Sequence, residues 1–111
     1  MNLTRQPIHQ KGQKAVRGTT AARLWLERVK GLPCVICKAP GPSDAHHVYH
    51  DRYGRNKASD FDTIPLCKHC HQDGPESVHK AKATWRAKHG PDWGYLPLVR
   101  AMLDTQDTVD F

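Results

Sequence analysis

Four cysteines of the 111-residue chain form two closely spaced pairs. Cys34 and Cys37 make one C-x2-C pair, and Cys67 and Cys70 make the second. Two intervening residues allow both thiolates of a turn to face one ion, and two such turns complete the tetrahedral set that Zn2+ accepts. Four buried free cysteines are the alternative, but two pairs at this spacing rarely arise by accident. The sequence therefore predicts a structural zinc ion with no open position for catalysis.

Four of the histidines near the cysteine pairs are candidates for chemistry. They are His46, His47, His71 and His79. Adjacent residues of a strand point to opposite faces, so one of His46 and His47 can bind an ion while the other faces a different group. His71 and His79 can meet that ion from across the hairpin. Because imidazole is both a metal ligand and a proton acceptor near neutral pH, this cluster indicates metal-assisted acid–base chemistry.

The elements that must position these residues are short. Three helices are expected, at residues 19–31, 75–90 and 93–103. Two short extended segments are expected at residues 45–49 and 61–66, separated by a polar loop at residues 51–57. This order, with little sheet and no internal repeat, predicts an α+β fold.

The run Ala45-His46-His47, followed by the stretch from Asp62 to His71, resembles the motif of the HNH (ββα-metal) endonuclease superfamily. In that family a metal ligand on a strand precedes the base histidine, an Asn precedes Leu-Cys-x-x-Cys-His, and a last ligand lies on a helix. Segments 57–67 and 79–90 most resemble the phage recombination-enhancement nucleases, which act with RecA. The resemblance, over residues 33–90, implies a small zinc-stabilised ββα-metal, treble-clef-like core with extra flanking helices.

By position, the resemblance makes His47 the general base and His46 a ligand of one catalytic divalent ion. His71 and His79 would complete the ligand set, and Asp62 takes the place of the family's Asn as a second catalytic residue. An aspartate can accept backbone N–H bonds and pin the loop, but it cannot donate, and Asn56 can do part of that work instead.

The gap between His71 and His79 is longer than is usual in the family, because Asp73-Gly74-Pro75 intervene. His71 is therefore either a ligand or only the residue that begins the helix. The catalytic ion is expected to be Mg2+, Mn2+, Ni2+ or Zn2+, and an all-imidazole set disfavours Mg2+, which prefers oxygen ligands.

The resemblance implies hydrolysis of DNA phosphodiester bonds to 5′-phosphate and 3′-hydroxyl ends. Neutral His47 would accept a proton from the attacking water, while the ion offsets charge on the phosphate. A non-catalytic zinc-binding DNA adaptor is the alternative, and it would need the cysteines but none of the four histidines. A secreted disulfide-bonded toxin is disfavoured by the close cysteine pairs and by the lack of a signal peptide.

The formal net charge of +6 is concentrated at the start of the chain. Residues 1–33 carry seven Lys/Arg and one acid, whereas the remaining residues are balanced. A basic arm is typical of proteins with a polyanionic partner, although it can also be a solubilising tail. The expected nucleic-acid contacts are Arg52, Arg55, Lys57, Lys11, Lys14 and Arg17. Cations on the helix after the second cysteine pair are either phosphate contacts or an ordinary solvated face: Lys80, Lys82, Arg86 and Lys88.

One nuclease domain is predicted at residues 19–104, between a flexible basic arm at 1–18 and a flexible acidic tail at 105–111. The chain has no apolar run of about 18 residues, so no membrane partner is expected. A monomer in the cytoplasm is expected, as a phage or prophage protein in a bacterial host. DNA is the expected partner, and the resemblance adds a RecA-type recombinase filament.

Overall fold

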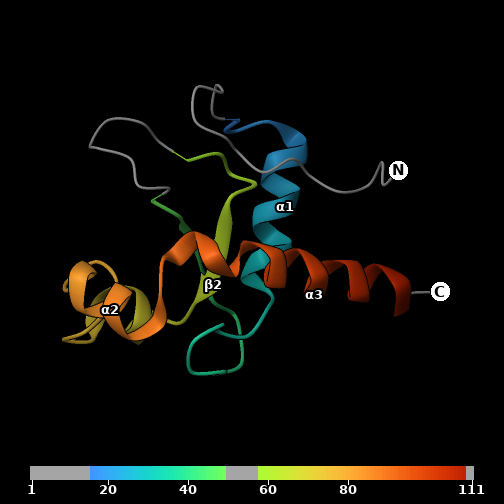
Figure 1. Ribbon diagram of the computed structural model, residues 1–111. Helices are drawn as coiled ribbons and strands as arrows, with labels where there is room; N and C mark the ends of the chain where they lie inside the picture. Colours follow the sequence, from blue (N-terminus) through green and yellow to red (C-terminus); the bar gives the residue numbers. More distant parts are fainter. Residues whose placement is uncertain (1–15, 50–57, 110–111) are drawn as a thin grey trace.

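The computed structural model describes residues 16–49 and 58–109. Their elements, shown in Figure 1, are α1 (Thr20–Lys30), β1 (Asp44–His47), β2 (Thr63–Leu66), a π-helical turn η1 (His69–Asp73), α2 (Lys82–His89), a 3-10 turn η2 (Asp92–Tyr95) and α3 (Leu96–Val109). One two-stranded sheet accompanies the helices in this part of the chain. The predicted α+β class is confirmed.

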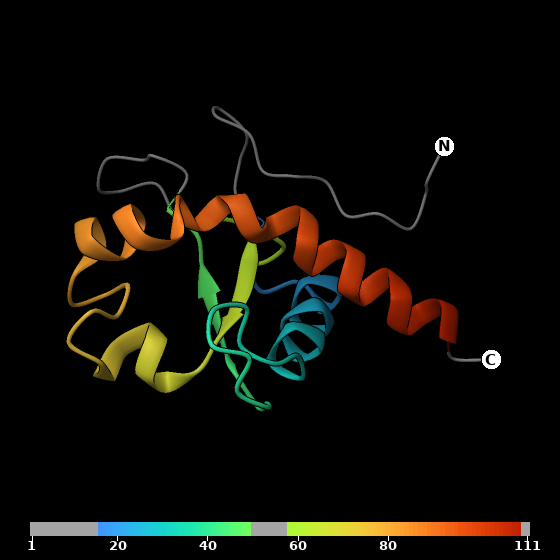
Figure 2. The same cartoon turned by 60° about the horizontal axis from the view of Figure 1, so that its bottom comes forward.

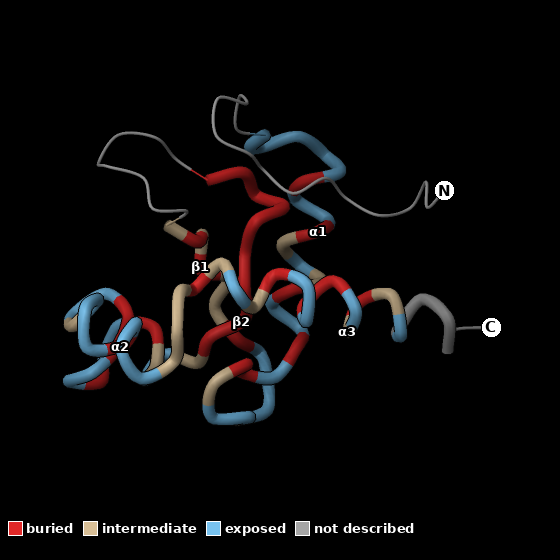
Figure 3. Tube along the Cα trace, in the orientation of Figure 1, coloured by how far each residue is buried: buried red, intermediate tan, exposed pale blue. Residues whose placement is uncertain are grey.

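Strands β1 and β2 pair in antiparallel register, with His46 opposite Ile64 and His47 opposite Thr63. All four residues of β2 are buried, and Figure 3 shows this strand as a continuous buried segment. Figure 2 shows the hairpin with α1 on one side and η1 on the other. The backbone of β2 also reaches the first cysteine pair, because the carbonyl of Pro65 accepts a hydrogen bond from the N–H of Val35 (3.0 Å). The hairpin is therefore the element that supports both ligand groups.

Helix α1 begins as predicted. Its N-cap is Thr19, whose hydroxyl accepts the N–H of Ala22 (3.1 Å), and Gly31 ends it. Its buried face is formed by Ala22, Trp25 and Val29, a spacing that makes one helical stripe. Together with the buried face of α3, this stripe covers the hairpin.

The predicted helix at residues 75–90 is wrong in its first half, because α2 begins only at Lys82. The N–H groups of Val78 and His79 bond to the carbonyls of Cys70 (3.0 Å) and His71 (3.2 Å), which lie eight residues earlier. A helix needs those groups to bond four residues back, so the segment folds as turns against η1 instead.

The boundaries predicted for the folded domain, at residues 19 and 104, also differ from those in the structure. Residues 1–15 and 110–111 lie outside the described residues, but residues 16–18 are bound to the body. Arg17 donates from Nε to the carbonyl of Ala58 (2.9 Å), and the N–H of Gly18 bonds to Oδ2 of Asp60 (2.8 Å). Helix α3 continues to Val109, past the predicted domain end at residue 104. No helix in the described part of the chain is long and apolar enough to span a membrane.

Candidate metal centres and active site

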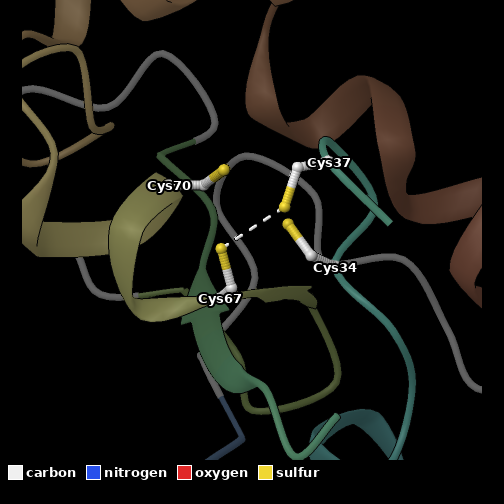
Figure 4. A group of neighbouring side chains, drawn as sticks. All are labelled: Cys34, Cys37, Cys67 and Cys70. Atoms are coloured by element: carbon white, nitrogen blue, oxygen red, sulfur yellow. Dashed lines mark hydrogen bonds between the residues drawn. The ribbon is translucent and has the colours of Figure 1, made fainter. Parts of the chain in front are cut away.

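The four cysteine sulfurs converge, as predicted. Figure 4 shows Cys34 and Cys37 from the turn after α1 facing Cys67 and Cys70 from the end of β2 and from η1. All four sulfurs lie within 4.8 Å of one another, and the Sγ atoms of Cys37 and Cys67 are 3.5 Å apart. This is a donor set that can hold a metal ion such as zinc, with each sulfur supplied by a short turn.

The charge state of the sulfurs supports a cation among them. Burial raises the pKa of the Cys34 thiol, but backbone N–H groups of Cys37, Cys67 and Ile36 lower it by more, so the pKa falls from 9.0 to about 7. Burial and the neighbouring sulfurs raise the pKa of Cys70. One thiolate therefore forms readily while another resists ionisation, and a divalent cation is the group that stabilises all of them together.

Three of the four predicted histidines form a second group. His46, His71 and His79 each offer a ring nitrogen, and these atoms lie within 4.8 Å of one another. The Nε2 atoms of His71 and His79 are 3.0 Å apart. Nitrogens bound at right angles to one ion at ~2.1 Å are about 3.0 Å apart, so the spacing fits a pair of ligands. His46 and His71 are buried while His79 is exposed, so the group faces solvent at His79.

Each of the two buried histidines is held through its other ring nitrogen by a carboxylate. His46 donates from Nε2 to Oδ2 of Asp92 (2.9 Å), and His71 donates from Nδ1 to Oδ2 of Asp44 (2.9 Å). Such a carboxylate fixes the tautomer and leaves the remaining nitrogen as a metal ligand. Asp44 lies two residues before His46 on the same strand face, so strand alternation could have identified it, whereas Asp92 had no sequence signal.

The exposed histidine is held by a tyrosine. The hydroxyl of Tyr49 lies 3.2 Å from Nδ1 of His79, which leaves Nε2 of His79 facing His71. The backbone N–H of Tyr49 also bonds to the Asp92 carboxylate (2.9 Å). Because Asp92 holds His46 and Tyr49 holds His79, this bond connects the partners of two candidate ligands.

The surroundings of His46 and His79 favour the neutral form of the ring, which is the form that binds a metal ion. Burial lowers the pKa of His46, and it outweighs the opposing hydrogen bond and charge of Asp92. Burial, together with the nearby His71 and His46 rings, lowers the pKa of His79. Both rings therefore stay unprotonated at neutral pH, which is the state that binds a metal ion.

His47, the predicted base, is not part of the converging group, since it leaves β1 on the opposite side from His46. Its Nε2 donates to Oδ1 of Asp60 (2.8 Å), which leaves Nδ1 as the proton-accepting nitrogen. Burial raises the pKa of Asp60, but hydrogen bonds from His47 and Gly18 and the Arg17 charge lower it by more, so the net shift is downward. The partner of His47 is therefore a stable carboxylate.

Asp62 is paired with helix α3. Its carboxylate is fully buried and pairs with Arg100 of α3 (Oδ1 to Nη2, 3.1 Å). Asp62 thus joins the start of β2 to α3, and the carboxylate that meets His47 belongs to Asp60, two positions earlier. A catalytic role for Asp62 stays a prediction.

Residues 12–105 match the protein family described as "Protein of unknown function (DUF968)". The chain belongs to the DUF968 family. Both candidate ligand groups of this DUF968 chain lie inside the matched residues. No curated protein and no solved structure matches the chain.

The turns between the two last ligands account for the long His71–His79 gap of the DUF968 chain. Gly74 donates its N–H to the carbonyl of His69 (2.9 Å), and a Cβ at this glycine would lie 2.7 Å from the same oxygen. Glycine is therefore required at this position, where the backbone reverses. The reversed segment then returns His79 to η1, beside His71.

Most predicted nucleic-acid contacts of the DUF968 chain lie outside the described residues: Lys11, Lys14, Arg52, Arg55 and Lys57, with Asn56. Arg17 is described, and its Nε is engaged by the carbonyl of Ala58. It lies close enough to Asp60 to lower that carboxyl's pKa, so it also supports the partner of His47.

Replacing Tyr49 with phenylalanine is expected to weaken metal binding at the histidine group of the DUF968 chain by about tenfold, because His79 loses its orienting partner. The measurement is calorimetric titration of Co2+ into protein whose cysteine group is already saturated with zinc. Tyr95→Phe is the matched control, since the Tyr95 hydroxyl donates to the carbonyl of His89 (2.8 Å), not to a ligand. Equal affinities for both variants would contradict the role given to Tyr49.

Proposed function

We propose that this DUF968 protein is a metal-dependent HNH-type endonuclease that hydrolyses DNA phosphodiester bonds to 5′-phosphate and 3′-hydroxyl ends. The observation that carries the proposal is the convergence of His46, His71 and His79 within 4.8 Å, next to His47 on the same hairpin. A cysteine-stabilised adaptor would need no such group. The resemblance of the motif to HNH nucleases supports the same reading.

His47 would act as the general base. With Nε2–H donated to Asp60, its Nδ1 can take the proton of a water that attacks the phosphorus. The ionised Asp60 carboxylate then stabilises the imidazolium that forms. We place the phosphate across the end of β1, because His46 and His47 leave this strand on opposite sides and the strand ends at His47.

His46, His71 and His79 would hold the divalent ion that offsets phosphate charge and stabilises the departing 3′ oxygen. Asp92, Asp44 and Tyr49 keep these rings oriented toward it. The four cysteines would hold the structural zinc and take no part in the reaction.

The narrower resemblance supports a more specific setting. Likeness to the phage recombination-enhancement nucleases makes a RecA-type filament on DNA a candidate partner. The corresponding setting is the cytoplasm of a bacterium carrying a phage or prophage, with the protein acting as a monomer.

Incubation of supercoiled and single-stranded DNA with the protein and Mg2+, Mn2+, Ni2+ or Zn2+ tests the proposal. Nicking is expected with ions that accept imidazole ligands, and Mg2+ should be the poorest. The assay is run with and without a recombinase filament, and ligation of the products checks for 5′-phosphate ends. Cleavage supported by Mg2+ alone would contradict the imidazole ligand set.

His71→Ala should abolish nicking, whereas His89→Ala, which changes a histidine outside both ligand groups, should retain it. DNA binding without nicking under every ion would support the adaptor alternative instead.

A further inference from the structure

Lys82 is the first residue of α2, and its ammonium packs on Tyr49, a neighbour of the histidine group. Its Nζ is 3.9 Å from the ring centroid of Tyr49. The same ring contacts His46 edge-on, at 5.3 Å between centroids, and its hydroxyl meets His79. One aromatic side chain therefore separates a cation from two candidate ligands.

The contact with Tyr49 fixes the position of the ammonium but does not neutralise it. A cation over an aromatic face is attracted by the ring quadrupole and keeps its formal charge. Lys82 is exposed, and within residues 16–49 and 58–109 its ammonium forms no ion pair. It therefore offers N–H donors to a phosphate from a defined position.

The neighbouring lysines are engaged differently. Lys88 pairs with the Glu76 carboxylate, and Lys80 donates from Nζ to the carbonyl of Asp73 (3.2 Å). Lys88 is thus neutralised, and Lys80 is tied to the turn beside η1. Of these three lysines, Lys82 combines a free charge with proximity to the histidine group.

We propose that Lys82 is a phosphate-binding residue of the site, and that Tyr49 holds it against the DNA strand bound beside His79. This inference rests on the proposed nuclease function and adds one residue that contacts the substrate. The sequence presents four similar cations on this segment, and the Tyr49 contact singles out this one.

A lysine–phosphate contact forms in the bound ground state and persists in the transition state. Its loss should therefore raise the dissociation constant and KM and leave kcat nearly unchanged. A phosphate contact also releases a condensed counterion, so its removal should reduce the slope of log K against log salt by about 0.9 on duplex DNA.

The test compares Lys82→Met with Lys88→Met, each of which removes one positive charge from an exposed lysine of α2. Affinity for a short fluorescent duplex is measured by anisotropy at several salt concentrations with Mn2+, in a His47→Ala background so that the DNA stays intact. Lys82→Met should bind about fivefold more weakly, with a reduced salt slope, whereas Lys88→Met should match the parent. Lys82→Arg should restore most of the affinity.

Steady-state nicking by the same substitutions in the active protein gives the second readout. A raised KM with unchanged kcat for Lys82→Met alone supports the inference. Equal losses in both variants would reveal a general charge effect and overturn it, as would a Lys82→Met variant that binds like the parent. Co2+ titration checks that the histidine group remains intact.

The two proposals fail in distinguishable ways. If the unmodified protein nicks DNA but Lys82→Met leaves binding and KM unchanged, only the inference on Lys82 is wrong. If the unmodified protein neither binds nor nicks DNA, the proposed function is wrong and the inference is wrong with it.

Discussion

Replacing His47 with alanine is expected to slow DNA nicking by about 10²–10⁴-fold, the usual contribution of a general base. The substitution removes the Nδ1 acceptor but none of the nitrogens that face the proposed ion, because His47 lies outside the converging group. Metal content and DNA affinity should therefore match those of the unmodified protein. Single-turnover nicking of supercoiled DNA, metal analysis and anisotropy together measure the three quantities.

Asp60→Asn tests the same proton transfer to His47 and should have a smaller effect on the nicking rate. The amide can still accept the hydrogen bond from Nε2 of His47, but it no longer carries the charge that stabilises the imidazolium. Its rate should lie between those of the unmodified protein and His47→Ala. A His47→Ala protein that nicks at the original rate would remove His47 from the mechanism, and an equal loss of metal would make it a ligand instead.

Disruption of the cysteine group is expected to have the largest effect on stability. Cys67→Ser, or removal of the ion by a strong chelator, should lower the free energy of unfolding by more than about 5 kcal/mol, which approaches the whole stability of a small domain. The reason is that Cys67 and Cys70 anchor the end of β2 and η1, while Cys34 and Cys37 anchor the turn after α1. Without the ion, nothing would bridge the four sulfurs at the junction of these elements.

Thermal unfolding followed by circular dichroism, with and without chelator, measures this effect. Lys68→Ala is the matched control, because this exposed neighbour of Cys67 is not a member of the ligand group. A chelated protein that melts at the temperature of the zinc-loaded protein would show that the cysteines are not a structural metal site.

Local spacing allowed the ligand groups to be predicted from the sequence. Two C-x2-C turns bring their sulfurs together through geometry that a few residues determine, and their convergence is confirmed. The hairpin was predictable because His46 and Ile64 lie in short extended segments that flank a polar loop. Helix α1, with its cap at Thr19 and its end at Gly31, was predictable for the same local reason.

Contacts between distant segments could not be predicted in this way. Asp92 lies 46 residues after His46, and only the fold brings its carboxylate to that ring. The start of α2 was misplaced because Pro75-Glu76-Ser77 is a good helix start locally, yet the bonds from Val78 and His79 to η1 override it. Motif position singled out Asp62 as a catalytic residue that pins the loop, but it gave no sign that the carboxylate of Asp60, two residues earlier, would meet His47.

The two ligand groups share one stretch of backbone: Cys70 and His71 are consecutive, and their carbonyls accept the N–H groups of Val78 and His79. Occupancy of one site should therefore depend on the other. If the cysteine group loses its ion, we expect His71 and His79 to lose their relative positions, so a cation added afterwards should not bind to the histidine group. The cysteine group would then have to bind its ion first, and the supply of that ion would limit how much of the protein acquires a complete histidine group.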